Sequence, residues 1–227
     1  MKKIFLAVLL AAASIGTASA QVEIGLKVSP SITNIRADSP SGTADNGFQN
    51  EKAKVGFGGG VIVDYFFGQN YAFSTGLFLT GKGGTISYYD PNTRARQQQK
   101  IGLQYLEVPI TVKLFTNDIA PDTKLYFQVG GTLAGALTAR INGDKFYQDP
   151  GDNNTETKAS KHVIIPDVAL LAAFGVEYQL GQSTRLLTGI SYHRGIVNID
   201  RYFDNTRKFR DVTLKNNEIA LDLGIKF

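Results

Sequence analysis

The stretch LQYLEVPITVKLF, residues 103–115, alternates strictly between two kinds of side chain. One set of positions is apolar: Leu106, Val108, Ile110, Val112 and Leu114. The other set is Tyr105, Glu107, Pro109, Thr111 and Lys113. Because successive side chains of a strand point to opposite faces, the stretch predicts a strand with one wholly apolar face and one face that carries both signs of charge. A soluble sandwich would turn the apolar face to its core, whereas a membrane barrel would turn it to lipid. The strand alone does not separate these two folds.

The first twenty residues predict export. Lys2 and Lys3 form a basic start, residues 4–13 form an apolar run, and residues 18–20 (ASA) form a small-residue cleavage site. Residues 1–20 are therefore expected to be a signal peptide, which leaves residues 21–227 as one mature domain. The apolar run is shorter than the about 20 residues that a spanning helix needs, which argues against a membrane anchor.

Composition removes several classes of site and partner. The sequence has no Cys, so disulfides, thiolate metal sites and a lipid-modified cysteine are excluded. The formal net charge is +4, and cleavage after residue 20 would halve it by removing Lys2 and Lys3. So small an excess argues against nucleic acid as a partner.

The alternating pattern recurs to give eight expected strands. They cover residues 22–32, 54–66, 71–79, 103–115, 125–137, 166–180, 184–197 and 218–227. Long connections at 34–53, 81–100, 140–162 and 198–213 alternate with short ones at 68–70, 116–123 and 181–183. This rhythm predicts an all-β fold, an eight-stranded antiparallel up-and-down transmembrane β-barrel with periplasmic turns, external loops and both termini periplasmic. The alternative is a lipocalin-like barrel, which usually carries a disulfide and an extra helix.

Two stretches resemble a known family. YLEVP at residues 105–109, followed by Lys113, is similar to the "YLEIP…K" strand of PorT-like outer-membrane β-barrel proteins. FGVEY at 174–178, SY at 191–192 and GIVNI at 195–199 resemble the last third of that family, and the terminal Phe227 resembles the C-terminal signal of outer-membrane barrels. The resemblance implies an integral outer-membrane barrel, and we expect the protein to be a monomer. Founding members are linked to secretion and gliding, and the family offers no catalytic residues to transfer.

The polar face of the strands is expected to line the lumen. Its charged residues are Glu23, Lys27, Asp64, Glu107, Lys113, Lys124, Asp167, Glu177, Arg185, Glu218, Asp222 and Lys226. An eight-stranded barrel is just wide enough for side chains to fill it, so these charges must pair or meet water. One interpretation is a lumen plugged by ion pairs. The other is a narrow porin-like channel for small solutes, for which Gly56, Gly58 and Gly60 would leave room.

Two further patterns suggest chemistry without establishing it. Ser191 and His193 share a strand face, and Glu177 lies in the neighbouring strand, which together are the parts of nucleophilic catalysis in a lipid-modifying enzyme. We interpret Ser191 and His193 as ordinary rim residues instead. Residues 149–156 carry clustered oxygen ligands suited to Ca²⁺ but lack EF-hand spacing, so a solvated loop is favoured. We therefore predict no catalytic, cofactor-binding or metal-binding residue.

Basic residues gather in two expected loops. They are Arg94, Arg96 and Lys100 in the second long loop, and Arg201, Arg207, Lys208 and Arg210 in the fourth. On the cell surface they could contact lipopolysaccharide phosphates, or they could simply be solvated. The sequence thus predicts an outer-membrane barrel with a structural or interaction role, whose partners are membrane lipid, lipopolysaccharide and an unidentified protein.

Overall fold

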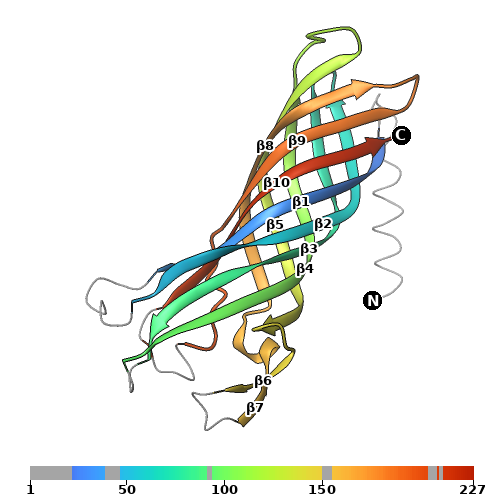
Figure 1. The fold of residues 1–227 in the computed structure, drawn as a ribbon. Helices are drawn as coiled ribbons and strands as arrows, with labels where there is room; N and C mark the ends of the chain where they lie inside the picture. Colours follow the sequence, from blue (N-terminus) through green and yellow to red (C-terminus); the bar gives the residue numbers. More distant parts are fainter. Residues whose placement is uncertain (1–21, 39–46, 91–93, 150–154, 204–208, 210–211) are drawn as a thin grey trace, which may run out of the picture.

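The computed structural model describes residues 22–38, 47–90, 94–149, 155–203, 209 and 212–227. The predicted signal peptide lies outside these residues. Eight strands close into a barrel (Figure 1). They are β1 (Val22–Asp38), β2 (Gln49–Gly68), β3 (Tyr71–Tyr89), β4 (Arg96–Phe115), β5 (Thr123–Ile141), β8 (Pro166–Gln179), β9 (Arg185–Gly195) and β10 (Thr213–Lys226).

The barrel has up-and-down connectivity. Around it the strands follow the order β1-β10-β9-β8-β5-β4-β3-β2, and each neighbouring pair is antiparallel. Between β5 and β8 lie a hairpin of β6 (Phe146–Asp149) and β7 (Thr155–Lys158) and the 3₁₀ helix η2 (Ala159–His162). The predicted eight-stranded antiparallel fold is confirmed. The described part of the chain has no helix long and apolar enough to cross a membrane.

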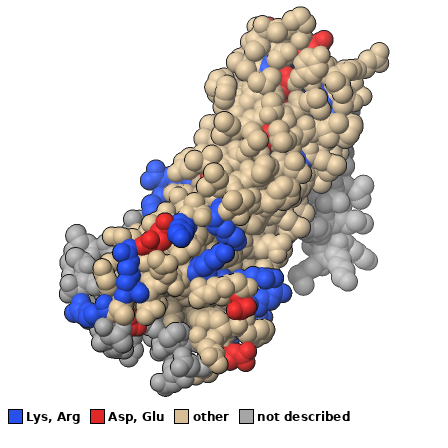
Figure 2. Space-filling model, in the orientation of Figure 1, with Lys and Arg blue, Asp and Glu red and all other residues tan. Residues whose placement is uncertain are grey.

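The two faces of β4 decide between the soluble and the membrane fold. Its apolar residues from Leu106 to Leu114 are 37–46% exposed, whereas Glu107 and Lys113 are 3% and 2% exposed. The other barrel strands repeat this arrangement, with large apolar side chains outside and charged ones inside. In Figure 2 the corresponding part of the surface shows few charged atoms. An apolar exterior would be unfavourable in water, and buried charges would be unfavourable in the core of a soluble barrel. A membrane barrel accommodates both, with its apolar face on lipid and its polar face in the lumen.

Toward the N-terminal, loop-end part of β4 the two faces exchange character. Beyond Tyr105 the buried positions become apolar at Leu103 and Ile101, and the outer positions become polar at Gln104 and Lys100. This part of β4, residues 96–104, follows the scheme of a soluble barrel. The exchange marks the level at which the strands leave the apolar belt, by which we mean the exposed apolar outer face of the barrel.

The short connections are confirmed, but many residues of the first three expected long loops belong to strands. β3 continues to Tyr89 and β4 begins at Arg96, so their hairpin loop is far shorter than residues 81–100. β1 likewise extends to Asp38, β2 begins at Gln49, and the third expected loop contains β6, β7 and η2. The prediction was wrong there because beyond the belt the outer face is polar. The apolar alternation therefore inverts, although the hydrogen-bonded ladder continues.

The barrel has a turn end, with the connections at residues 69–70, 116–122 and 180–184, and a loop end, with the long connections and the β6–β7 hairpin (Figure 1). We predict that the loop end faces the cell exterior. The chain has no natural Cys, so cysteines at Glu156 in β7 and at Gln182 can be labelled selectively. An impermeant maleimide on whole cells should label residue 156, and residue 182 only after permeabilisation. The reverse pattern would invert the orientation.

Candidate functional site

The lumen nearest the turn end holds a network of buried ion pairs. Lys113 on β4 and Lys226 on β10 both contact the same oxygen of Asp64, with Nζ–Oδ2 distances of 2.8 and 3.0 Å. Lys226 also lies 2.6 Å from Glu177 Oε2 and 3.0 Å from Glu23 Oε2. Arg185 pairs with Glu23 as well. These side chains come from six strands, so the turn-end network ties opposite walls of the barrel together.

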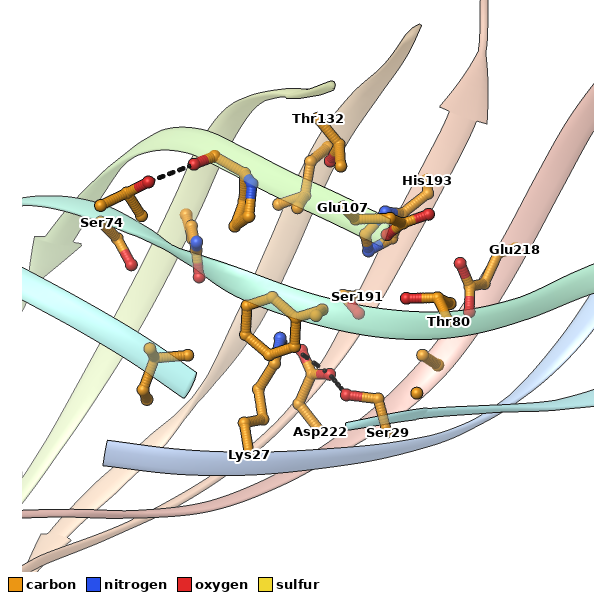
Figure 3. Close-up of a pocket in the computed structure, with 18 of the residues that line it drawn as sticks. Lys27, Ser29, Ser74, Thr80, Glu107, Thr132, Ser191, His193, Glu218 and Asp222 are labelled. Carbon is orange, nitrogen blue, oxygen red and sulfur yellow. Dashed lines mark hydrogen bonds and ion pairs between the residues drawn. The ribbon is translucent and has the colours of Figure 1, made fainter. Parts of the chain in front are cut away.

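A small polar cavity lies in the middle of the lumen (Figure 3). On one side, Lys27 Nζ lies 3.2 Å from Asp222 Oδ1, and the hydroxyl of Ser29 donates a hydrogen bond of 2.6 Å to the same oxygen. The cavity measures about 40 Å³, which is room for about three water molecules. Ser191 and His193 line it, and their Oγ and Nδ1 atoms have no hydrogen-bond partner within the described chain. They are therefore placed to bind water.

Lys82 is the centre of a third charged group, toward the loop end. Its ammonium lies 2.6 Å from Glu107 Oε1 and 3.3 Å from Glu218 Oε2, and all three side chains are almost fully buried. Nearby, the amide of Asn216 donates hydrogen bonds to Asp167 (2.8 Å) and to the hydroxyl of Tyr105 (3.0 Å).

The same region contains a group of side chains with metal-ligand chemistry. One ligand atom each from Glu107, His193 and Glu218 lie within 4.8 Å of one another. Lys82 already contacts both carboxylates, so a side chain supplies the positive charge that a metal ion would bring. This arrangement favours a structural ion-pair cluster over a metal centre.

The loop-end half of the lumen is filled by an apolar cluster. Its fully buried members are Ile35, Ile86, Tyr88, Ile101, Leu103, Tyr105, Ala139, Ile141, Ala159, Val163, Ile199, Tyr202, Phe203, Phe209, Val212 and Leu214. Phe48 stacks on Tyr88 and meets Phe203 edge to face, with ring centroids 5.5 and 5.0 Å apart. Asp200 holds residues 200–203 together by accepting hydrogen bonds from the backbone amides of Tyr202 and Phe203.

Sequence reasoning missed Lys82 and this apolar cluster for one reason. Most of these residues fall in stretches assigned to long loops, where inward-facing positions were not considered. The alternation Phe78, Thr80, Lys82 along β3, all of them buried, is the signal that identifies Lys82 as a lumen residue.

Most of the predicted lumen charges do face the lumen. Lys124 is an exception, because it lies at the turn end, where its side chain is 41% exposed and its ammonium lies 3.8 Å from the exposed Asp118. The three predicted glycines differ in the room they leave, and Gly58 lines the small central cavity. A Cβ at Gly60 would collide with the backbone of Leu77, and one at Gly56 with that of Gly81. These two glycines allow strands β2 and β3 to approach closely.

The suspected catalytic residues do not meet. Ser191 and His193 are 1% and 9% exposed, so they lie inside the lumen and are not rim residues as predicted. Glu177 pairs with Leu187 across β8 and β9, whereas His193 pairs with Leu171, six residues away on β8. That separation is about 20 Å along a strand. Glu177 contacts Lys113 and Lys226 instead.

The predicted loop sites are only partly described. Arg96 and Lys100 lie in β4, and Arg96 pairs with Glu51 of β2. Arg207, Lys208 and Arg210 lie outside the described residues, as does most of the calcium candidate at 149–156.

The family described as "Outer membrane protein beta-barrel domain" matches residues 13–201. The chain belongs to this family. Together with the exposed apolar belt, this makes it an integral outer-membrane protein.

Solved structures share the fold. OprG from Pseudomonas aeruginosa has a TM-score of 0.51 and 10% identity, with 90% of this chain and 95% of that chain covered. Neisserial surface protein A has a TM-score of 0.47 and 12% identity, with coverages of 92% and 98%. Ail of Yersinia pestis, solved with the heparin analogue sucrose octasulfate, has a TM-score of 0.43 and 12% identity, with coverages of 91% and 99%. No curated protein matches the chain.

Proposed function

We propose that this protein is a non-conducting barrel with a structural or interaction role in the outer membrane. The observation that carries the proposal is that side chains fill the lumen on both sides of the small central cavity. Ion pairs centred on Lys226 occupy its turn-end part, those centred on Lys82 lie toward the loop end, and the apolar cluster around Phe203 occupies the loop end itself.

The physical argument is that this filling is hard to open. Separating a buried charge from its partners without full hydration would cost several kcal/mol of free energy per charge. Lys226 has three carboxylate partners, so no single side-chain rotation frees it. A chain of water or ions through the barrel would have to break this network and also pass the apolar cluster.

A narrow channel is the alternative, and one feature favours it. A cavity of about 840 Å³ opens at the turn end, lined by Glu23, Lys124, Glu177 and Arg185. It resembles a vestibule. In the proposed function this vestibule ends at the turn-end network.

Single-channel conductance separates the two functions. The refolded protein in planar bilayers should show no steady openings, and its insertion should be verified independently by protection of the barrel strands from protease. Steady, reproducible channels from inserted protein would contradict the proposal and favour the channel.

We also propose that the PorT-like resemblance reflects the architecture of the lumen. In the YLEVP stretch and the following lysine, Tyr105 accepts a hydrogen bond from Asn216, Glu107 binds Lys82, and Lys113 binds Asp64. The residues that carry the resemblance are thus anchors of the barrel interior. They supply no reason to assign a secretion role or an enzymatic one.

A further inference from the structure

A groove of about 510 Å³ crosses the outer face of β2, β3, β4 and β5 where these strands leave the apolar belt. Phe57 and Leu79 form its apolar side and are 61% and 48% exposed. Lys54, Arg140 and Lys145 line it as well and give it a positive charge. One continuous surface therefore offers an apolar area and a group of cations.

A β-bulge brings Lys54 to this groove. β2 shifts register against β3 between Ala53 and Gly58, and Val55, next in sequence to Lys54, is 82% exposed. A shift of this kind can re-aim a side chain, and Lys54 lines the groove together with Phe57. Lys54 Nζ lies 3.4 Å from the carbonyl oxygen of Lys82, so the lysine spans the outside of β3.

Gly102 on β4 leaves room between two of the cations. A Cβ at this position would lie 3.1 Å from Lys54 Nζ and 3.9 Å from Arg140 Cβ. Arg140 is the cross-strand partner of Gly102 on β5. Lys54 and Arg140 therefore approach the same point of the outer face from two sides.

The cations of this groove repel one another. Lys100 and Arg140 both repel the charge of Lys54. Within the described chain, no carboxylate forms an ion pair with any of these three or with Lys145, whereas Arg96 is paired with Glu51 and Lys124 lies near Asp118. Figure 2 shows Lys and Arg gathered on the loop-end half of the visible surface. Uncompensated like charges at close range favour a bound anion.

We propose that this groove binds one phosphorylated glycolipid of the outer leaflet, the lipid A part of lipopolysaccharide. Lys54 and Arg140 would hold a phosphate group, with arginine suited to bidentate contact, and Phe57 and Leu79 would contact an acyl chain. The level of the groove, at the edge of the belt on the loop end, is where a lipid headgroup lies. The proposal does not depend on whether the lumen conducts.

Titration of the refolded full-length protein in zwitterionic detergent with purified lipid A tests this directly. The double substitution Lys54→Gln and Arg140→Gln should weaken binding about 25-fold, or about fivefold for each cation lost. Gln104→Glu, which places a carboxylate in the groove, should weaken it as well while changing little of the packing. The matched control removes two other cations by Lys124→Gln and Lys215→Gln and should bind like the parent.

The remaining arms identify the ligand. Lipid A stripped of its phosphates should bind at least tenfold more weakly than intact lipid A, and inorganic phosphate at equal concentration should not displace the lipid. Equal binding of the stripped lipid, or displacement by inorganic phosphate, would overturn the assignment to a phosphorylated lipid. Unchanged affinity for lipid A in both groove variants, with intact folding by circular dichroism, would show that the groove does not bind the lipid.

Discussion

Replacement of Lys82 by methionine is expected to lower the free energy of unfolding by about 3–5 kcal/mol. Lys82 is the cation shared by Glu107 and Glu218, at 2.6 and 3.3 Å, and it is only 2% exposed. Methionine keeps much of the apolar stem but removes the charge. The two carboxylates would then remain buried close to each other and to His193.

Comparison with other substitutions separates charge from packing. Glu107→Gln should cost less than Lys82→Met, because Lys82 would keep Glu218 as a partner. The triple variant Lys82→Met, Glu107→Gln, Glu218→Gln should recover much of the loss, since no unpaired charge remains. The measurement is the urea unfolding midpoint of the barrel refolded in lipid.

The reference for these variants is Glu156→Ala, in the exposed β7 strand. Glu51 is a poor reference, because it accepts a hydrogen bond from Ser87 and pairs with Arg96. If Lys82→Met and Glu156→Ala had equal midpoints, the lumen charges would have to be hydrated and independent. That result would favour the channel over the closed barrel.

Substitution of Ile110 by arginine is the second large effect, with an expected cost of about 2–4 kcal/mol. Ile110 lies on the outer face of β4, opposite Thr75 and Gly131 on the neighbouring strands, and is 46% exposed. An arginine there would project into the hydrocarbon near the middle of the belt. Refolding into lipid vesicles, followed by urea titration, measures the cost.

Gln98→Arg is the matched control for Ile110→Arg. Gln98 is exposed on the same strand but lies beyond Tyr105, where the outer face is polar, so arginine should cost less than about 1 kcal/mol. Thr111→Arg is less informative. Thr111 is 2% exposed and bonded to Ser74 and Gln128, so its replacement would also disrupt packing. Equal costs of Ile110→Arg and Gln98→Arg would contradict the assignment of residue 110 to the apolar belt and of residue 98 to the region beyond it.

Much of the fold could be predicted from residue order alone. Alternation along residues 103–115 placed Leu106 and Glu107 on opposite faces, and the recurrence of this pattern predicted the strand count and the short turns. Both predictions follow from the period of two residues that every strand obeys. Compartment and membrane insertion followed from the signal peptide pattern and the alternating connection lengths.

Strand length and ion pairing were not predictable in the same way. Beyond the apolar belt, toward the loop end, the long strands carry polar residues on their outer face. The composition of these parts therefore resembles that of a loop, and Lys82 was overlooked for this reason. Neighbouring strands offered Lys124 and Asp64 as partners for Glu107 and Lys113. Asp64 does bind Lys113, whereas Lys124 lies at the turn end and Glu107 binds Lys82.

The sequence by itself determined which residues of each strand share a face, because that depends only on the period of two along the chain. Only the tertiary structure decided which charges pair, since Lys82 and Glu218 are far apart in sequence and meet through barrel closure and strand register. It also decided the direction of Lys54, because the bulge between Ala53 and Gly58 arises from the pairing of β2 with β3. Register and closure are properties of several strands together, and no single strand encodes them.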